Sequence, residues 1–171
     1  AKKELEIKIE QCAPAREDGT APNVEMVFCK IPAMEDSTDP DLYSAAVTNL
    51  RVQVRIGEAA IYLIDDGVMS DMEISDRFID FNQEYPELEN ADDISWHIKE
   101  SEFMDDEHFE GIPDDLQLHF MKLTSMEDNG KKEKTQKSYE WQKQTLENMM
   151  NNNLLRSEDE IGTVDIDKRY M

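Results

Sequence analysis

The sequence predicts an α/β fold: a single three-layer-like domain over residues 1–171, with a central mixed sheet of about four to five strands and three main helices. Segments with strand-like and helix-like patterns alternate along the chain, which is the order typical of this class. Residues 59–64 are apolar at every position, as in a strand that is covered on both faces. A length of 171 residues suits one domain with its own core.

Two strand-like segments open the chain. Leu5, Ile7 and Ile9 alternate with charged residues over 4–10, which predicts a half-buried strand. Residues 13–23 contain two prolines and a glycine and predict a loop. Residues 24–30 predict a second strand. Because the loop is too short for a helical crossover, the two strands are either a hairpin or not neighbours.

The two cysteines, Cys12 and Cys29, lie at or near the ends of these apolar runs. Two buried free thiols are one interpretation, and a disulfide between neighbouring strands is the other. Without a companion histidine cluster, two cysteines do not indicate a zinc site.

Two helices flank the apolar segment 59–64. The first begins with Asp39 as N-cap and Pro40 at the first helical position, and Gly57 is a natural stop. The second is expected to follow a capping-box pattern at Ser70 and Glu73 and to end before Pro86. The helically spaced apolar and small residues of the first helix are Leu42, Ala45, Ala46, Asn49, Leu50 and Val54.

The C-terminal half begins with an acidic, irregular region over 87–115, which contains one short possible strand at 94–98. Residues 116–123 alternate partly and predict a further strand. Residues 134–152 predict the last long helix. Ile161, Val164 and Ile166 are expected to form a short edge strand.

Charge limits the classes of function. The chain has 40 acidic and 18 basic residues and a formal net charge of -22. A field of this sign repels phosphate backbones, so the sequence predicts no nucleic-acid binding other than by mimicry of DNA. No apolar run approaches the roughly 18 residues of a membrane span, so we expect membrane attachment only through an anchor absent from this chain. The start at Ala1 without methionine is consistent with removal of an initiator methionine or of an N-terminal anchor.

Two carboxylates are the first candidates for a site. Asp65 and Asp66 follow the buried segment 59–64, and ligands of open α/β sheets bind beyond the carboxyl ends of the strands. The pair could hold a divalent cation or act as acid and base. The alternative is ordinary turn and capping chemistry, which Asp-Asp-Gly also supports.

A cluster of lysines is the second candidate. Four of them precede or open the last helix, namely Lys131, Lys132, Lys134 and Lys137, and Lys143 follows. They form either a solvated helix face or a docking patch for an acidic partner or another copy of the protein.

Other chemistry is not indicated. The histidines His97, His108 and His119 have no partner at metal-ligand spacing, although His97 is a candidate pocket-wall residue. The sequence contains no arrangement typical of a nucleophile, no glycine-rich phosphate loop and no calcium-loop pattern. No cofactor is specified.

Residues 42–66 resemble a group of small, uncharacterised bacterial proteins that are displayed outside the cytoplasmic membrane on an N-terminal anchor. The likeness consists of an amphipathic helix closed by Gly57-Glu58 and a hydrophobic strand closed by Asp65-Asp66. The chain departs from the group at residues 13–23, where there is no room for the helix that usually separates the first two strands. The resemblance implies an extracytoplasmic location and no known activity.

These features support three hypotheses. The first is a non-enzymatic binding or interaction domain with a protein partner, which forms the exported part of a membrane-anchored protein. The second is an enzyme that uses Asp65, Asp66 and a divalent metal. The third is a cytoplasmic acidic protein that inhibits or mimics a nucleic-acid ligand.

Overall fold

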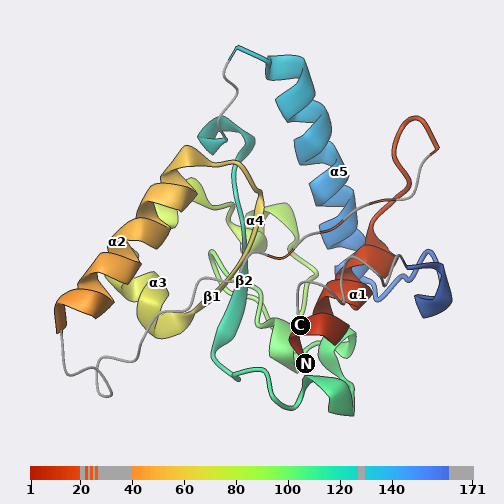
Figure 1. Cartoon of the computed structure of the whole chain (residues 1–171), viewed down its shortest axis with the longest axis horizontal. Helices are drawn as coiled ribbons and strands as arrows, with labels where there is room; N and C mark the ends of the chain where they lie inside the picture. Colours follow the sequence, from red (N-terminus) through yellow and green to blue (C-terminus); the bar gives the residue numbers. More distant parts are fainter. Residues whose placement is uncertain (20–21, 23, 25, 27–39, 127–129, 162–171) are drawn as a thin grey trace.

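The structure is a computed structural model that describes residues 1–19, 22, 24, 26, 40–126 and 130–161. In these residues helices surround a sheet of only two antiparallel strands (Figure 1). The predicted mixed sheet of four to five strands in three layers is therefore wrong. The helices and strands are α1 (Lys2–Cys12), α2 (Pro40–Ile56), β1 (Ile61–Asp65), α3 (Asp66–Met72), α4 (Phe81–Glu84), β2 (Leu116–Phe120) and α5 (Lys132–Met150), joined by several single-turn 3-10 helices.

The first segment is the helix α1 and not the predicted strand. Leu5, Ile9 and Cys12 follow i, i+4, i+7 spacing and are buried in the main core. Ile7 projects elsewhere and is buried against Ile161. Residues two apart in a helix point to nearly opposite sides, so Leu5, Ile7 and Ile9 alternate along the sequence as they would in a strand.

The apolar segment does form a strand, β1, but this strand lies in a two-stranded sheet. β1 and β2 are paired antiparallel with Leu63 opposite Leu118. The predicted strand at 94–98 is reduced to a bridge, in which Trp96 and Leu118 exchange backbone hydrogen bonds of 2.9 Å. The predicted strand over 24–30 and the edge strand through Val164 and Ile166 fall largely outside the described residues.

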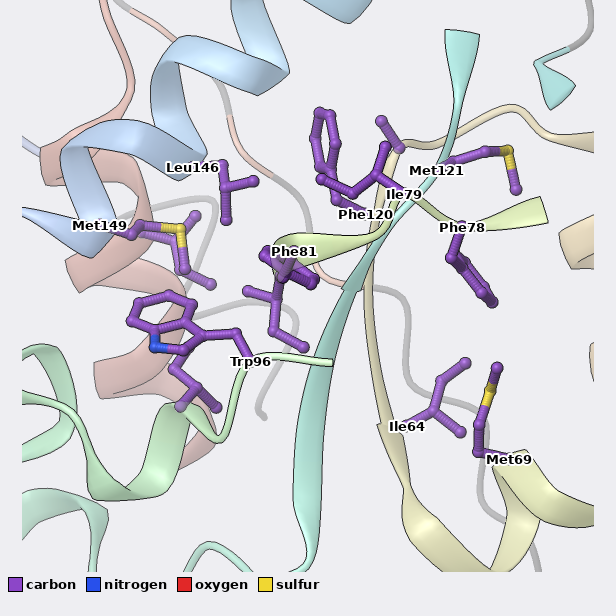
Figure 2. Close-up of a cluster of buried hydrophobic side chains, with 14 of the residues drawn as sticks. Ile64, Met69, Phe78, Ile79, Phe81, Trp96, Phe120, Met121, Leu146 and Met149 are labelled. Atoms are coloured by element: carbon purple, nitrogen blue, oxygen red, sulfur yellow. The ribbon is translucent and has the colours of Figure 1, made fainter. Parts of the chain in front are cut away.

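Helices and loops cover both faces of this small sheet. Figure 2 shows Ile64, Met69 and Phe78 on one side of the strands, and Trp96 and Leu146 on the other. Since residues paired in an antiparallel sheet share a face, the face with Tyr62 and His119 contacts Phe78, and the opposite face with Phe120 contacts Tyr139 of α5. These contacts take the place of the outer layers of an α/β sandwich.

The structure confirms the helix predicted to begin at Pro40 as α2, and it confirms the helix predicted over 134–152 as α5, with both ends two residues earlier. α2 ends before Gly57, whose φ of +70° and close approach to Ser125 leave no room for a side chain. Its predicted N-cap, Asp39, lies outside the described residues. α5 covers Lys132–Met150 and buries Leu146 and Met149.

The helix predicted from Ser70 begins earlier. Asp65 is the N-cap of α3, and Glu73 ends this helix in a left-handed conformation with φ 52°. The Ser70 hydroxyl instead donates to the carbonyl of Asp66, four residues before it in the helix. The capping-box prediction is wrong because the buried strand leads directly into the helix at Asp66.

The C-terminal end of α1 is held by residues that are distant in sequence. Arg156 donates through Nη1 to the carbonyls of Glu10 and Ala13 at 2.5 and 2.6 Å. Asn148 donates to the carbonyl of Cys12 at 2.8 Å, and Trp141 donates to that of Pro14 at 2.9 Å. These hydrogen bonds satisfy carbonyls that the helix end leaves open.

Candidate interaction surfaces

The two predicted carboxylates lie at the junction of β1 and α3. Asp65 accepts a hydrogen bond of 2.9 Å from the backbone N–H of Val68 through Oδ1, so it caps the helix. Asp66 is exposed, and its backbone N–H donates to the carbonyl of Asp115 at 3.2 Å. In the described residues no group of three or more histidine, cysteine, aspartate or glutamate side chains is arranged to hold a metal ion. The geometry of Asp65 is thus that of an N-cap.

The predicted lysines gather at the N-terminal end of α5. Lys131, Lys132, Lys134 and Lys137, the lysine cluster from here on, are all exposed and line a shallow hollow together with Gly130 and Glu133. Lys137 lies 3.6 Å from the carboxylate of Glu17 and 3.7 Å from that of Glu133. Positive charge at this end opposes the helix dipole, so the cluster does not serve to stabilise α5.

His97 belongs to a small polar cluster that the sequence did not reveal. Asp92 accepts from Ser95 at 2.5 Å through Oδ1 and contacts His97 Nε2 at 2.8 Å through Oδ2. Partial burial acts to raise the pKa of Asp92, but the hydrogen bonds from Ser95 and His97 outweigh burial and hold this pKa below its usual value. Serine and histidine bind the same carboxylate and not each other, so the cluster does not activate a nucleophile. It closes the turn before Trp96.

The other two histidines differ in burial. His108 is exposed and contacts Asp106, whose hydrogen bond raises the pKa of the imidazole. His119 is 1% exposed, and its Nδ1 lies 2.9 Å from the carbonyl of Ile94. Burial lowers the pKa of His119. His119 Nε2 has no hydrogen-bond partner among the described residues.

The buried cysteine, Cys12, is an unreactive thiol. Cys12 is a free thiol with no exposed surface, and burial raises its pKa to about 12. Such a thiol does not form the reactive thiolate at neutral pH. Cys29 lies outside the described residues.

The most exposed apolar side chains of the described residues include three from α2. Leu42, Val52 and Ile56 are 58%, 48% and 44% exposed. With Ala45 and Asn49, also exposed, they recur at i, i+3, i+7, i+10 and i+14. We call these five residues the outer stripe. Such spacing keeps side chains on one face of a helix, and α2 lies at the periphery of the molecule (Figure 1).

A second stripe attaches α2 to the protein. Val47 and Val54 are buried, and Tyr43 and Leu50 pack against the core. These four recur at i, i+4, i+7 and i+11, which places them roughly opposite the outer stripe at about 100° per residue. The sequence-based prediction merged residues of both stripes into one. The signal that separates them is the seven-residue repeat from Leu42 through Asn49 to Ile56.

Polar contacts fix the orientation of α2. The Tyr43 hydroxyl donates to the Asp71 carboxylate at 2.5 Å, and Arg51 donates to the Asp71 carbonyl at 2.8 Å. Arg77 donates to the carbonyl of Arg55 at 3.2 Å. These hydrogen bonds fix the rotation of α2 about its axis, with the outer stripe facing away from α3.

Comparisons with protein-family models, with curated proteins and with solved structures gave no match. No helix of the described residues is long and apolar enough to cross a lipid bilayer.

Proposed function

We propose that the protein is a non-enzymatic interaction domain that binds a protein partner through the outer stripe of α2. The observation that carries this proposal is the exposure of Leu42, Val52 and Ile56 on one helix face, opposite the face that holds α2 to the core. Contiguous apolar surface of this kind on a soluble protein is typical of an interaction site.

The energetic argument concerns the cost of this exposure. Fully burying a leucine, valine or isoleucine side chain contributes about 1.5–3 kcal/mol. The protein forgoes about half of this gain at three positions of one helix, although polar residues there would leave the buried stripe intact. A partner that covers the outer stripe recovers this free energy on binding.

The acidic-mimic alternative draws on a different surface. Asp105, Asp106, Glu107, Glu110 and Asp114 line a hollow at the acidic region. Glutamates and aspartates occur throughout the chain, however, and the net charge of -22 is sufficient to explain their presence as solvated surface. Among the described residues, Leu154 and Leu155 are also exposed, but the outer stripe alone repeats its exposed apolar residues along one face of a helix.

The experiment places a photo-crosslinking amino acid at Val52 and, as the control, at Gln144, an exposed position on α5. Both variants are irradiated in the cells that naturally make the protein. We expect a covalent adduct of defined mass from position 52, identified by mass spectrometry, and none from position 144. The adduct is lost when Leu42→Ser and Ile56→Ser are added. Equal labelling from both positions, or none from position 52, would contradict the proposal.

We also propose that the domain acts outside the cytoplasmic membrane. Support comes from the resemblance of residues 42–66 to anchored extracytoplasmic proteins. Cell fractionation with an antibody against the native protein tests this. Recovery with the cytoplasmic fraction alone is the outcome that contradicts it.

A further inference from the structure

We infer that the outer stripe binds the outer stripe of a second copy of this chain, with the two α2 helices antiparallel about a two-fold axis near Asn49. This inference rests on the proposed function and names the partner. Three features of α2 support it: the symmetry of its apolar residues, the position of its charges and the place of its one polar stripe residue.

The apolar residues are symmetric about Asn49. Leu42 lies seven residues before Asn49 and Ile56 seven residues after it. A two-fold axis at Asn49 therefore brings Leu42 of one copy opposite Ile56 of the other. Such an interface is self-complementary, as closed dimers require. The 3-4-3-4 spacing of the stripe is the spacing of paired helices.

The charges beside the stripe are complementary under the same symmetry. Asp41, Thr48 and Arg55 follow one flank of the stripe at intervals of seven residues. The axis places Asp41 of one copy within about 3 Å, along the helix, of Arg55 of the other, since each residue adds about 1.5 Å. In a parallel pair this flank of one helix would instead face the opposite flank of the other, where Ala46 and Gln53 lie. Only the antiparallel arrangement brings Asp41 and Arg55 together, so the charges favour it.

Asn49 lies on the axis itself. A single asparagine in the apolar seam of paired helices fixes their register, because two facing amides can hydrogen bond to each other while other registers leave them unsatisfied. The copies thus have one favoured alignment. In this alignment the partner's stripe covers both Leu42 and Ile56 of each copy.

Charge and size set the strength of the dimer. Each copy carries a net charge of -22, so the two bodies repel at long range, and added salt screens this repulsion. α2 itself carries one acidic residue, Asp41, and two basic residues, Arg51 and Arg55. The stripe is about 21 Å long, and a contact of one helix pair is of the size found in transient complexes.

The first experiment is sedimentation of the purified protein from about 1 µM to about 1 mM, the range in which transient interfaces associate. We expect a monomer–dimer equilibrium that strengthens as salt rises from low to moderate concentration. Val52→Asp weakens association at least tenfold, whereas Gln144→Asp, which makes the same charge change on α5, leaves it unchanged. Circular dichroism confirms that both variants are folded.

The second experiment determines the orientation in a Cys29→Ser background, in which the buried Cys12 remains. Asn49→Cys is expected to form a disulfide dimer under mild oxidation. Leu42→Cys and Ile56→Cys do not cross-link alone, because like residues then lie about 21 Å apart, but they cross-link when mixed.

The outcomes separate the inference from the proposed function. A protein that stays monomeric throughout the concentration range overturns the inference, and so does self-linking of Leu42→Cys. Dimers that dissociate with salt and ignore Val52→Asp would assign association to the lysine cluster and also overturn it. If the photo-crosslinked adduct at position 52 contains a different protein and the purified chain is monomeric, the proposed function stands and this inference fails.

Discussion

His119 is a buried histidine whose protonation opposes folding. Its side chain is 1% exposed, contacts the ring of Phe78 and has one hydrogen-bonding neighbour, the carbonyl of Ile94. Because burial disfavours the imidazolium, the pKa of His119 in the folded protein lies below 6.5. The unfolded chain therefore takes up a proton at a pH where the folded protein does not.

The sign of the pH effect follows from this difference. As pH falls below 6.5, the unfolded state binds more protons at this position, so the free energy of unfolding decreases by up to about 1.4 kcal/mol per pH unit. We expect urea unfolding of the wild type to show this loss and His119→Gln to show a smaller one. The difference between the two proteins removes the contributions of His97 and His108. Parallel pH profiles would contradict a neutral, buried His119.

The role of a single residue was hard to predict from the sequence where that role depends on a neighbouring residue in the fold. Asp65 was recognised as a candidate for either ligand binding or capping, and the structure shows the cap. The hydrogen bonds of Asp92 with Ser95 and His97 depend on a local turn that no pattern in the sequence marks. The outer stripe was present in the sequence, but Leu42, Ala45 and Asn49 were grouped with Leu50 and Val54 in one helical pattern. Val52 and Ile56 were left out of that pattern.

At the scale of the element, α3 depends on its N-cap. Asp65→Ala removes the acceptor for the Val68 N–H and should lower the free energy of unfolding by about 1 kcal/mol. Asp65→Asn retains a side-chain oxygen and should lose only a few tenths of that amount. Chemical denaturation of the two variants measures this difference.

The same variants test the metal hypothesis. Capping alone predicts that, at constant ionic strength, calcium, magnesium and manganese leave the melting temperature of the wild type unchanged, and that Asp66→Asn behaves like the wild type. A cation-dependent rise in melting temperature that Asp65→Asn abolishes would instead support a metal site.

α1 depends on Arg156. This guanidinium donates to two carbonyls at the end of the helix, and hydrogen bonds from charged groups contribute about 1.5–3 kcal/mol. Arg156→Ala should lower the free energy of unfolding by about this amount, and Arg156→Lys should recover only part of it because the ammonium lacks the planar fork. Arg16→Ala, at an exposed position with the same charge change, is the control. Equal losses in Arg16→Ala and Arg156→Ala would contradict the role of Arg156.

The elements differ in how well their sequences predicted them. α5 and α2 have a helical period over many turns and a clear stop, so their extents were predictable. α1 was mistaken for a strand because Ile7 is buried against Ile161, a contact between distant parts of the chain. A local pattern cannot distinguish a helix covered on two sides from a strand covered on one.

On the scale of the whole molecule, the net charge of -22 opposes the compact state. Salt shortens the range of this repulsion from about 30 Å at 0.01 M to about 3 Å at 1 M. We expect the free energy of unfolding, measured with urea, to rise with sodium chloride by an amount on the order of 1 kcal/mol. Potassium chloride should give the same curve, which excludes binding of a particular cation. A flat or falling curve would show that local ion pairs outweigh the global repulsion.

The predicted fold class failed at this scale chiefly in the interpretation of one segment. Residues 59–64 are apolar throughout, and this was taken to indicate a strand of a larger sheet that is covered on both faces. The structure instead places α3 and the segment around Phe78 against β1 and packs α5 against β2, in a sheet of two strands. Within β1 only Ile64 is fully buried. Apolar composition indicated a strand that contacts the core, whereas its degree of burial and the elements that cover it depend on long-range packing.

The attachment of α1 to residues near 156 has a consequence for synthesis on the ribosome. About 145 residues separate Arg156 from the carbonyls that it binds, and chains grow by about 5–20 residues per second. The residues that bind the end of α1 therefore leave the ribosome on the order of 10 s after Leu5 and Ile9. During this interval the apolar side chains of α1 are exposed on the nascent chain, which makes this segment a binding site for a chaperone. We expect α1 to be the last helix of the domain to reach its final packing.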